Sequence, residues 1–568
     1  MNRRTSLSTF IGKAESTSPN TIQHQNALPV GGGLNPHTGT FNYAMAAHLL
    51  RRASFGPTHQ QIKQAVNDGL NATVTKLLNV QAETTKPLNP SFTLDPKVAV
   101  GETWVYTVNT NNVQGLGTYR VNSLRAWIME LIFNEGVSVR EKMTMFWHNH
   151  FVTSENEDAR QEYDYIRLIR EFAVGNFKEL TQRMTPNIAM LRYLNGNLNT
   201  RTAPNENFAR ELMELFVLGK GNLAGPGDYT TFTEMDVLAV ARIMTGFTIP
   251  NLNDEPNLPK NIDPITGYYK ATWNANRHDT TDKILSHRFN NKIIKNGAEN
   301  EYKNFIDFMF AEKQQEIAIH LCRKLYRFFI YYKVDAAIEN EIVAGLAQVL
   351  IDHNFDVKPV LETLFKSQHF YEQGALGCLI KSPYEYIFNV LKGMKMQVPT
   401  ALADKYSFFQ SLFRQTAGMQ MTYFDLPSVA GWEAYYQEPG YNRVWINSVT
   451  LIQRFGWPTN YINKNIKVNS VSYGLALIDY IDQFTNPSDS TLLINEIIAH
   501  QFPQGVTNKQ RDALLKSLHG TNGTAAQWAT TYNAYKNDST NATKRTAVEA
   551  RLRPFTVALV SMSEYHLS

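Results

Sequence analysis

Two histidines lie close together in an apolar, aromatic stretch, VREKMTMFWHNHF. The spacing predicts a helix, and at about 100° per residue His150 shares a face with Phe146 and Trp147, whereas His148 lies on the opposite face. We therefore expect His150 to be the more buried of the two. An imidazole can act as a general base, ligate a metal or form hydrogen bonds inside a core. The residues alone leave these three roles open.

Two carboxylates form a second candidate cluster, in PNENFARELMELFVLGKG. On a helix, Glu211 and Glu214 border the apolar stripe that contains Phe208 and Leu212. A half-buried pair of carboxylates could act as a general acid and base or offer oxygen ligands to a cation. It could equally hold arginines of neighbouring helices. Because a desolvated carboxylate needs a partner to stay charged, we expect this pair to lie close to His150 or to a basic cluster.

The basic cluster comes early in the chain, where His48, Arg51 and Arg52 precede the turn SFGP. Their spacing of i, i+3 and i+4 places them on one helical face. Arginine offers a planar fork of donors, so this face could bind a phosphate, sulfate or carboxylate group of a substrate. Pairing with the two glutamates inside the protein is the alternative, and the absence of any phosphate-loop motif favours it.

A late aromatic loop, DLPSVAGW, supplies a third candidate. Trp432, together with Arg443 and Trp445, could form the wall of a pocket that stacks on a sugar or an aromatic group. Anchoring of one part of the protein on another explains the same residues. A glycan or another small molecule is therefore the ligand class that this loop indicates.

Composition excludes several classes of protein. The 55 Lys and Arg residues nearly balance the 51 Asp and Glu residues, and no long basic tract is present, so nucleic-acid binding is not expected. The only cysteines, Cys322 and Cys378, form no CxxC motif, which excludes a disulfide framework and a cysteine-rich zinc site but leaves a single disulfide open. HExxH, GxSxG and paired ExxH motifs are absent, which disfavours zinc proteases, serine hydrolases and di-iron enzymes.

The periodicity predicts a mainly α fold, with a multi-helix orthogonal or bundle architecture in two packed lobes. At 568 residues the chain exceeds the size at which one core keeps growing. We expect an arm at residues 1–40, a helical lobe at 41–244, a hairpin excursion at 245–292 that holds the only notable β structure, and a second helical lobe at 293–568. The arm is expected to be either disordered or pinned onto the surface.

Localisation is left open by the sequence. No apolar run approaches the roughly 20 residues that cross a bilayer, so no transmembrane segment is expected. The start MNRRTSLSTF resembles a twin-arginine export signal, which favours export. Lys13 and Glu15 lie where such a signal needs an apolar region, which favours a cytoplasmic protein.

Five ordered blocks carry a resemblance to a known family. They are HLLRRASFGPT, FWHNHF, NIAMLRYLNGNLN, PNENFARELMELFVLGKG and LPSVAGW with the later RVWINSVTLIQRF. Together they resemble the bacterial domain of unknown function 1800 family, from about His48 to the C-terminal SMSEYHLS. The resemblance implies a shared fold and shared boundaries, and it brings no established reaction, substrate or cofactor.

Two functional hypotheses follow. The first is a metal-assisted enzyme that acts on an envelope or polysaccharide substrate, with His148, His150, Glu211 and Glu214 meeting in a cleft. The alternative is a non-catalytic helical binding or scaffold protein whose polar blocks are buried networks. Histidines beside carboxylates in an open cleft would favour the enzyme, and sealed, paired histidines would favour the alternative. No pattern identifies a metal, a cofactor or an oligomeric state.

Overall fold

The structure is a computed structural model that describes residues 27–82, 84–91, 93–109, 113–154 and 158–568. The export-like start and most of the predicted arm lie outside these described residues. The rest of that arm, residues 27–40, is pinned onto the body. The amide of His37 donates to the Lys366 carbonyl at 2.7 Å, and the amide of Gln368 donates to the Asn35 carbonyl at 2.7 Å.

The fold is mainly α-helical, which confirms the fold class that the periodicity predicts. Residues 314–329 form α12, whose buried residues recur every three or four positions, as the helical period requires. Thr58 and Ser382 form capping boxes at the starts of α3 and α15, where they satisfy amide groups that lack helical partners. None of the described helices combines the length and the apolar character needed to cross a bilayer.

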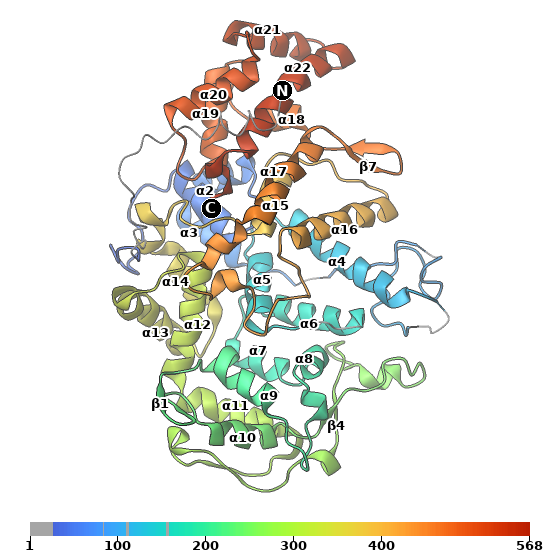
Figure 1. Cartoon of the computed structure of the whole chain (residues 1–568), viewed down its shortest axis with the longest axis vertical. Helices are drawn as coiled ribbons and strands as arrows, with labels where there is room; N and C mark the ends of the chain where they lie inside the picture. Colours follow the sequence, from blue (N-terminus) through green and yellow to red (C-terminus); the bar gives the residue numbers. More distant parts are fainter. Residues whose placement is uncertain (1–26, 83, 92, 110–112, 155–157) are drawn as a thin grey trace.

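The helices follow one another along the whole chain (Figure 1). They are α2 (Tyr43–Ala53), α3 (His59–Leu78), α4 (Leu116–Asn134), α5 (Arg140–His150), α6 (Ala159–Glu171), α7 (Phe177–Met184), α8 (Ile188–Tyr193), α9 (Glu206–Glu211), the π-helix η2 (Leu212–Val217), α10 (Glu234–Ile243), α11 (Glu301–Glu312), α12 (Gln314–Phe329), the π-helix η7 (Ile338–Val343), α13 (Ala344–Asp352), α14 (Val357–Lys366), α15 (Pro383–Leu391), α16 (Leu402–Gly418), α17 (Ser448–Ile462), α18 (Leu477–Ile481), α19 (Ser490–Gln501), α20 (Asn508–His519), α21 (Ala525–Lys536) and α22 (Ala542–Val560).

Strands in the described residues form four two-stranded antiparallel sheets. The prediction that the excursion at 245–292 holds the only notable β structure is wrong, because two further hairpins lie outside it. Strands of two or three residues are too short to show alternation in the sequence. The pairs are β1 (Leu223–Gly225) with β2 (Asp228–Tyr229), β3 (Phe247–Thr248) with β4 (Thr272–Trp273), β5 (Lys283–Ile284) with β6 (Ile293–Ile294), and β7 (Ile466–Val468) with β8 (Val471–Tyr473).

One connected set of buried apolar side chains extends from Leu28 to Tyr565. Elements far apart in the sequence share it, so that α4 packs against α16 and α2 packs against both α3 and α19. Figure 1 shows α9, α10 and α11 at one end of the molecule and α19 to α22 at the other, with α5, α6, α12 and α15 between them. The predicted division into an arm, two lobes and an excursion stays a prediction.

Candidate functional site

Helix α5 carries both histidines of the first candidate cluster, and both are enclosed. The exposed fraction is 0% for His148 and 2% for His150. The prediction that His150 is the more buried is therefore wrong. The two histidines do lie on different faces of α5, but both faces are covered by other parts of the protein. The His148 face packs against Tyr423 and Trp432. The His150 face packs against η2 and α12.

His148 has a protein partner at each ring nitrogen. The amide of Phe424 donates to Nε2 at 3.0 Å, which places the proton of the neutral ring on Nδ1. From there the ring donates to the hydroxyl of Tyr165 at 2.9 Å, and this hydroxyl donates to the Phe151 carbonyl at 2.6 Å. Burial lowers the pKa of His148 to about 3. The ring is thus a neutral link between α5, α6 and the segment that contains Phe424.

His150 is bound to the C-terminal end of the π-helix η2. Its Nε2 donates to the Phe216 carbonyl at 2.7 Å, and its Nδ1 accepts from the amine of Lys324 at 3.3 Å. Lys324 also donates to the Leu215 carbonyl at 2.7 Å, as does His320 at 2.9 Å. The last carbonyls of a helix lack main-chain partners and attract cationic or donor groups. This cluster therefore caps η2, and burial lowers the pKa of Lys324 to about 7.

The carboxylates of the second cluster do not meet the histidines. Glu214 forms an ion pair with Lys220 at 3.0 Å on the outer side of the helix. Burial and the charge of Glu214 raise the pKa of Glu211. The prediction that these carboxylates approach His150 or the basic cluster is wrong, because η2 presents its terminal carbonyl groups, and not its carboxylates, to α5 and α12.

The basic cluster on α2 is an internal brace. Nε2 of His48 lies 3.0 Å from the Phe370 carbonyl, Arg51 donates to the His500 carbonyl at 2.6 Å, and Arg52 donates to the Ile330 carbonyl at 2.9 Å. All three basic side chains are buried. Both alternatives that the sequence left open are therefore wrong. The cluster does not form a surface site for an anionic substrate, and it does not pair with Glu211 or Glu214. Main-chain carbonyls of three distant segments are the observed partners.

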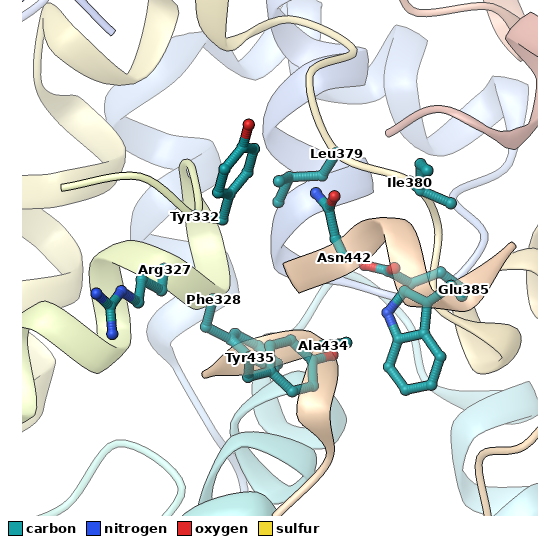
Figure 2. Close-up of a pocket in the computed structure, with 10 residues that line it drawn as sticks. Arg327, Phe328, Tyr332, Leu379, Ile380, Glu385, Ala434, Tyr435 and Asn442 are labelled. Carbon is teal, nitrogen blue, oxygen red and sulfur yellow. The ribbon is translucent and has the colours of Figure 1, made fainter. Parts of the chain in front are cut away.

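A pocket opens between the end of α12, the start of α15 and two short 3-10 helices, η10 (Glu433–Tyr435) and η11 (Tyr441–Trp445). The cavity itself has a volume of about 20 Å³, which is room for one water-sized group such as a hydroxyl. Aromatic rings supply much of its wall, as Figure 2 shows. The lining residues are Arg327, Phe328, Tyr332, Leu379, Ile380, Glu385, Ala434, Tyr435, Asn442 and Trp445.

Asn442 is, with Arg327, one of the two lining side chains that have a buried nitrogen without a partner among the described residues. It is 8% exposed, and its Nδ2 has no hydrogen-bond acceptor among the described residues. Figure 2 shows its amide directed into the space beside Leu379 and Tyr332. The hydroxyl of Tyr332 accepts from Arg443 at 2.8 Å, which holds this ring in place. A buried donor without an acceptor costs about 1–3 kcal/mol, so a ligand that accepts from Asn442 would remove this cost.

Glu385 contributes a carboxylate to the pocket. It forms a buried ion pair with Lys142 of α5 and accepts from the amide of Ser382 at 2.6 Å in the capping box of α15. Burial alone would raise the pKa of Glu385, but the charge and hydrogen bond of Lys142 bring it below its ordinary value. Burial and the charge of Glu385 raise the pKa of Tyr435. At neutral pH the pocket therefore offers a carboxylate and a protonated phenol.

The lowered pKa of Glu385 gives an expected pH dependence. A depressed carboxylate contributes stability above its unfolded pKa of 4.5, and this contribution is lost as the pH falls through the lower folded value. We expect the free energy of unfolding to decline below pH 4.5 more steeply in the unaltered protein than in Glu385→Gln. Urea denaturation at a series of pH values measures both slopes. Parallel profiles would contradict a charged Glu385.

The late aromatic loop was predicted in part. Trp445 lines the pocket, and Arg443 positions the lining residue Tyr332. Trp432 instead is buried against the ring of His148, with centroids 5.9 Å apart, because the loop folds inward over α5 before it reaches the pocket. Neither Glu385 nor Asn442 was among the residues predicted for the site. The capping box SPYE could have placed Glu385 at a helix start, but no pattern links it to the aromatic loop.

Neither a metal-binding cluster nor a disulfide is found among the described residues. Within the described ranges, no three His, Cys, Asp or Glu side chains gather in a way that could hold a metal ion. Cys322 and Cys378 are both free thiols, so the single disulfide that the sequence left open is not formed.

Comparison with known proteins places the chain in one family. The family model described as "Protein of unknown function (DUF1800)" matches residues 48–566. Searches of curated proteins and of solved structures gave no match. The matched residues span nearly the whole chain and include the α2 brace, both histidines of α5 and every residue of the pocket. The chain therefore belongs to the DUF1800 family.

Proposed function

We propose that this protein is a non-catalytic helical binding protein whose pocket takes a hydroxyl group of a ligand that lies at the pocket mouth, such as the terminal sugar of a glycan. The observation that carries the proposal is the unpartnered amide of Asn442, which is buried among aromatic side chains in the wall of the pocket. Sugar rings offer C–H faces that pack on aromatic rings and hydroxyl groups that pair with planar polar side chains. The pocket supplies both kinds of group.

The contacts of the pocket support this ligand class in detail. Trp445 and Tyr435 meet edge to face, with ring centroids 6.2 Å apart, so two aromatic surfaces border one space at an angle. Asn442 offers a donor, and Glu385 offers carboxylate oxygens that can accept from hydroxyl groups. A charged phosphate would face the carboxylate of Glu385, which disfavours it.

The histidine contacts favour binding over the metal-assisted enzyme. His148 has protein partners at both ring nitrogens, and so does His150. A metal ligand or a general base needs a ring nitrogen free to face a ligand. The carboxylates Glu211 and Glu214 lie apart from both rings in the hydrogen-bond network. A catalytic role of these four residues, on an envelope or polysaccharide substrate, would require the network to open.

Saturation-transfer NMR against glucose, galactose, mannose, N-acetylglucosamine and glucuronate tests the proposal, followed by calorimetric titration of any sugar that binds. We expect Asn442→Ala to weaken binding about fivefold to tenfold, because one neutral hydrogen bond contributes about 0.5–1.5 kcal/mol. The melting temperature should change little, since the substitution removes a buried group that has no partner in the free protein.

Gln437→Ala is the matched control. Gln437 lies in the same segment, is exposed and is absent from the pocket wall. It should leave the dissociation constant unchanged. Equal affinities of the Asn442 and Gln437 variants would place the sugar elsewhere, and failure of all the sugars to bind would contradict the proposed ligand class.

A further inference from the structure

A group of cations is buried behind the pocket without carboxylate partners. Arg51, Arg52, Lys381 and Arg454 are each at most 5% exposed. Within the described part of the chain, none of the four forms an ion pair with a carboxylate, and all donate to main-chain carbonyls instead. The nearby acid, Glu385, is engaged with Lys142. Uncompensated charges are costly to bury, so this region favours an added negative charge.

Arg52 has one buried nitrogen without a partner, Nε, and Arg454 and His566 have two each. Arg454 uses Nη2 to reach the Lys381 carbonyl at 2.7 Å, but its Nε and Nη1 are buried without partners. Both ring nitrogens of His566 are also buried without partners among the described residues. The exposed fractions are 0% for Arg454 and 2% for His566. Four polar nitrogens of Arg454 and His566 are therefore unsatisfied in a closed part of the protein, where such atoms normally have a partner.

Both side chains contact one aromatic ring, that of Tyr386. His566 stacks on Tyr386 with centroids 5.0 Å apart, and the guanidinium carbon of Arg454 lies 5.0 Å from the centre of the same ring. Phe455 approaches His566 edge on at 5.7 Å. The charges of Arg454 and Lys381, after burial itself, lower the pKa of His566. His566 is therefore surrounded by aromatic rings and lies in a positive electrostatic potential.

We propose that a small inorganic anion of the halide class binds inside the protein at the unpartnered nitrogens of Arg454 and His566, beside the ring of Tyr386. A halide ion accepts hydrogen bonds from several N–H groups at once. It also balances the charge of the guanidinium group, whereas a water molecule in the same place would leave that charge uncompensated. The enclosure of both side chains favours a monatomic ion over phosphate or sulfate. The proposal does not rest on the function proposed for the pocket.

Bromide is the probe, because its anomalous X-ray signal distinguishes it from water. Crystals of the full chain grown in sodium bromide should show an anomalous peak within hydrogen-bond distance of Arg454 and His566. In solution, the melting temperature at constant ionic strength should rise with the logarithm of the bromide or chloride concentration when gluconate is replaced. A site without an anomalous peak, or with water alone, would overturn the proposal.

Arg454→Met keeps much of the side-chain volume and removes the charge, and it should abolish the halide dependence of the melting temperature. Arg414→Met, at an exposed arginine, should retain this dependence. A halide effect of equal size in both variants would overturn the site. If Arg454→Met does not fold, the anomalous peak of the unaltered protein decides the question.

Discussion

Replacing Glu141 with alanine is expected to lower the free energy of unfolding by about 3–5 kcal/mol. Nη1 of Arg170 on α6 donates hydrogen bonds to both carboxylate oxygens of Glu141 on α5. The exposed fraction is 4% for the Glu141 side chain and 2% for the Arg170 side chain. Removing the carboxylate leaves the guanidinium buried without it. Such a loss far exceeds the value of an exposed ion pair, because water cannot replace the missing charge.

Urea denaturation followed by circular dichroism measures this change. The matched control is Glu206→Ala, which breaks a helical ion pair with Arg210 whose side chains are 39% and 31% exposed. The control should cost less than about 1 kcal/mol. The double variant Glu141→Leu with Arg170→Met should recover much of the loss. If Glu141→Ala costs no more than the control, the buried pair does not stabilise the junction of α5 and α6.

The second large effect concerns the two histidines. His148→Ala and His150→Ala are each expected to lower the free energy of unfolding by about 2–4 kcal/mol, through a cavity and an orphaned partner. The first leaves the amide of Phe424 without its acceptor, and the second leaves the Phe216 carbonyl without its donor. The two losses should be similar, since both rings are fully enclosed.

The same denaturation experiment checks these variants. A small loss for His148→Ala beside a large loss for His150→Ala would restore the view that only one face of α5 is buried. Small losses for both would mean that neither ring is a structural link. Either outcome would contradict the sealed hydrogen-bond network around α5.

The sequence predicted the helices better than the contacts between them. Periodicity located α12 because burial on one side of a helix repeats at helical spacing. It could not foresee that α5 is covered on both sides, since the covering segment near Tyr423 lies far along the chain. The helix predicted to carry Phe208 and Glu214 is split into α9 and η2, and the capping of η2 by Lys324 has no sequence signature.

The candidate site was predicted only where its residues share one loop. Trp445 was found because aromatic residues cluster around it, whereas Glu385 and Phe328 come from separate helices that only the fold brings together. The sequence predicted carboxylate partners for the arginines of α2, because a sequence shows which side chains carry opposite charges. Their observed partners are main-chain carbonyls, which every residue carries and which no pattern can single out.

We propose that the pocket binds the ligand and that the histidines hold the fold together. Calorimetric titration of Asn442→Ala and His150→Ala with a sugar that binds the unaltered protein, at a temperature where both variants are folded, tests it most directly. We expect Asn442→Ala to weaken binding about fivefold to tenfold, whereas His150→Ala should keep the dissociation constant within about twofold despite its lower stability. Loss of binding in His150→Ala with unchanged binding in Asn442→Ala would contradict it.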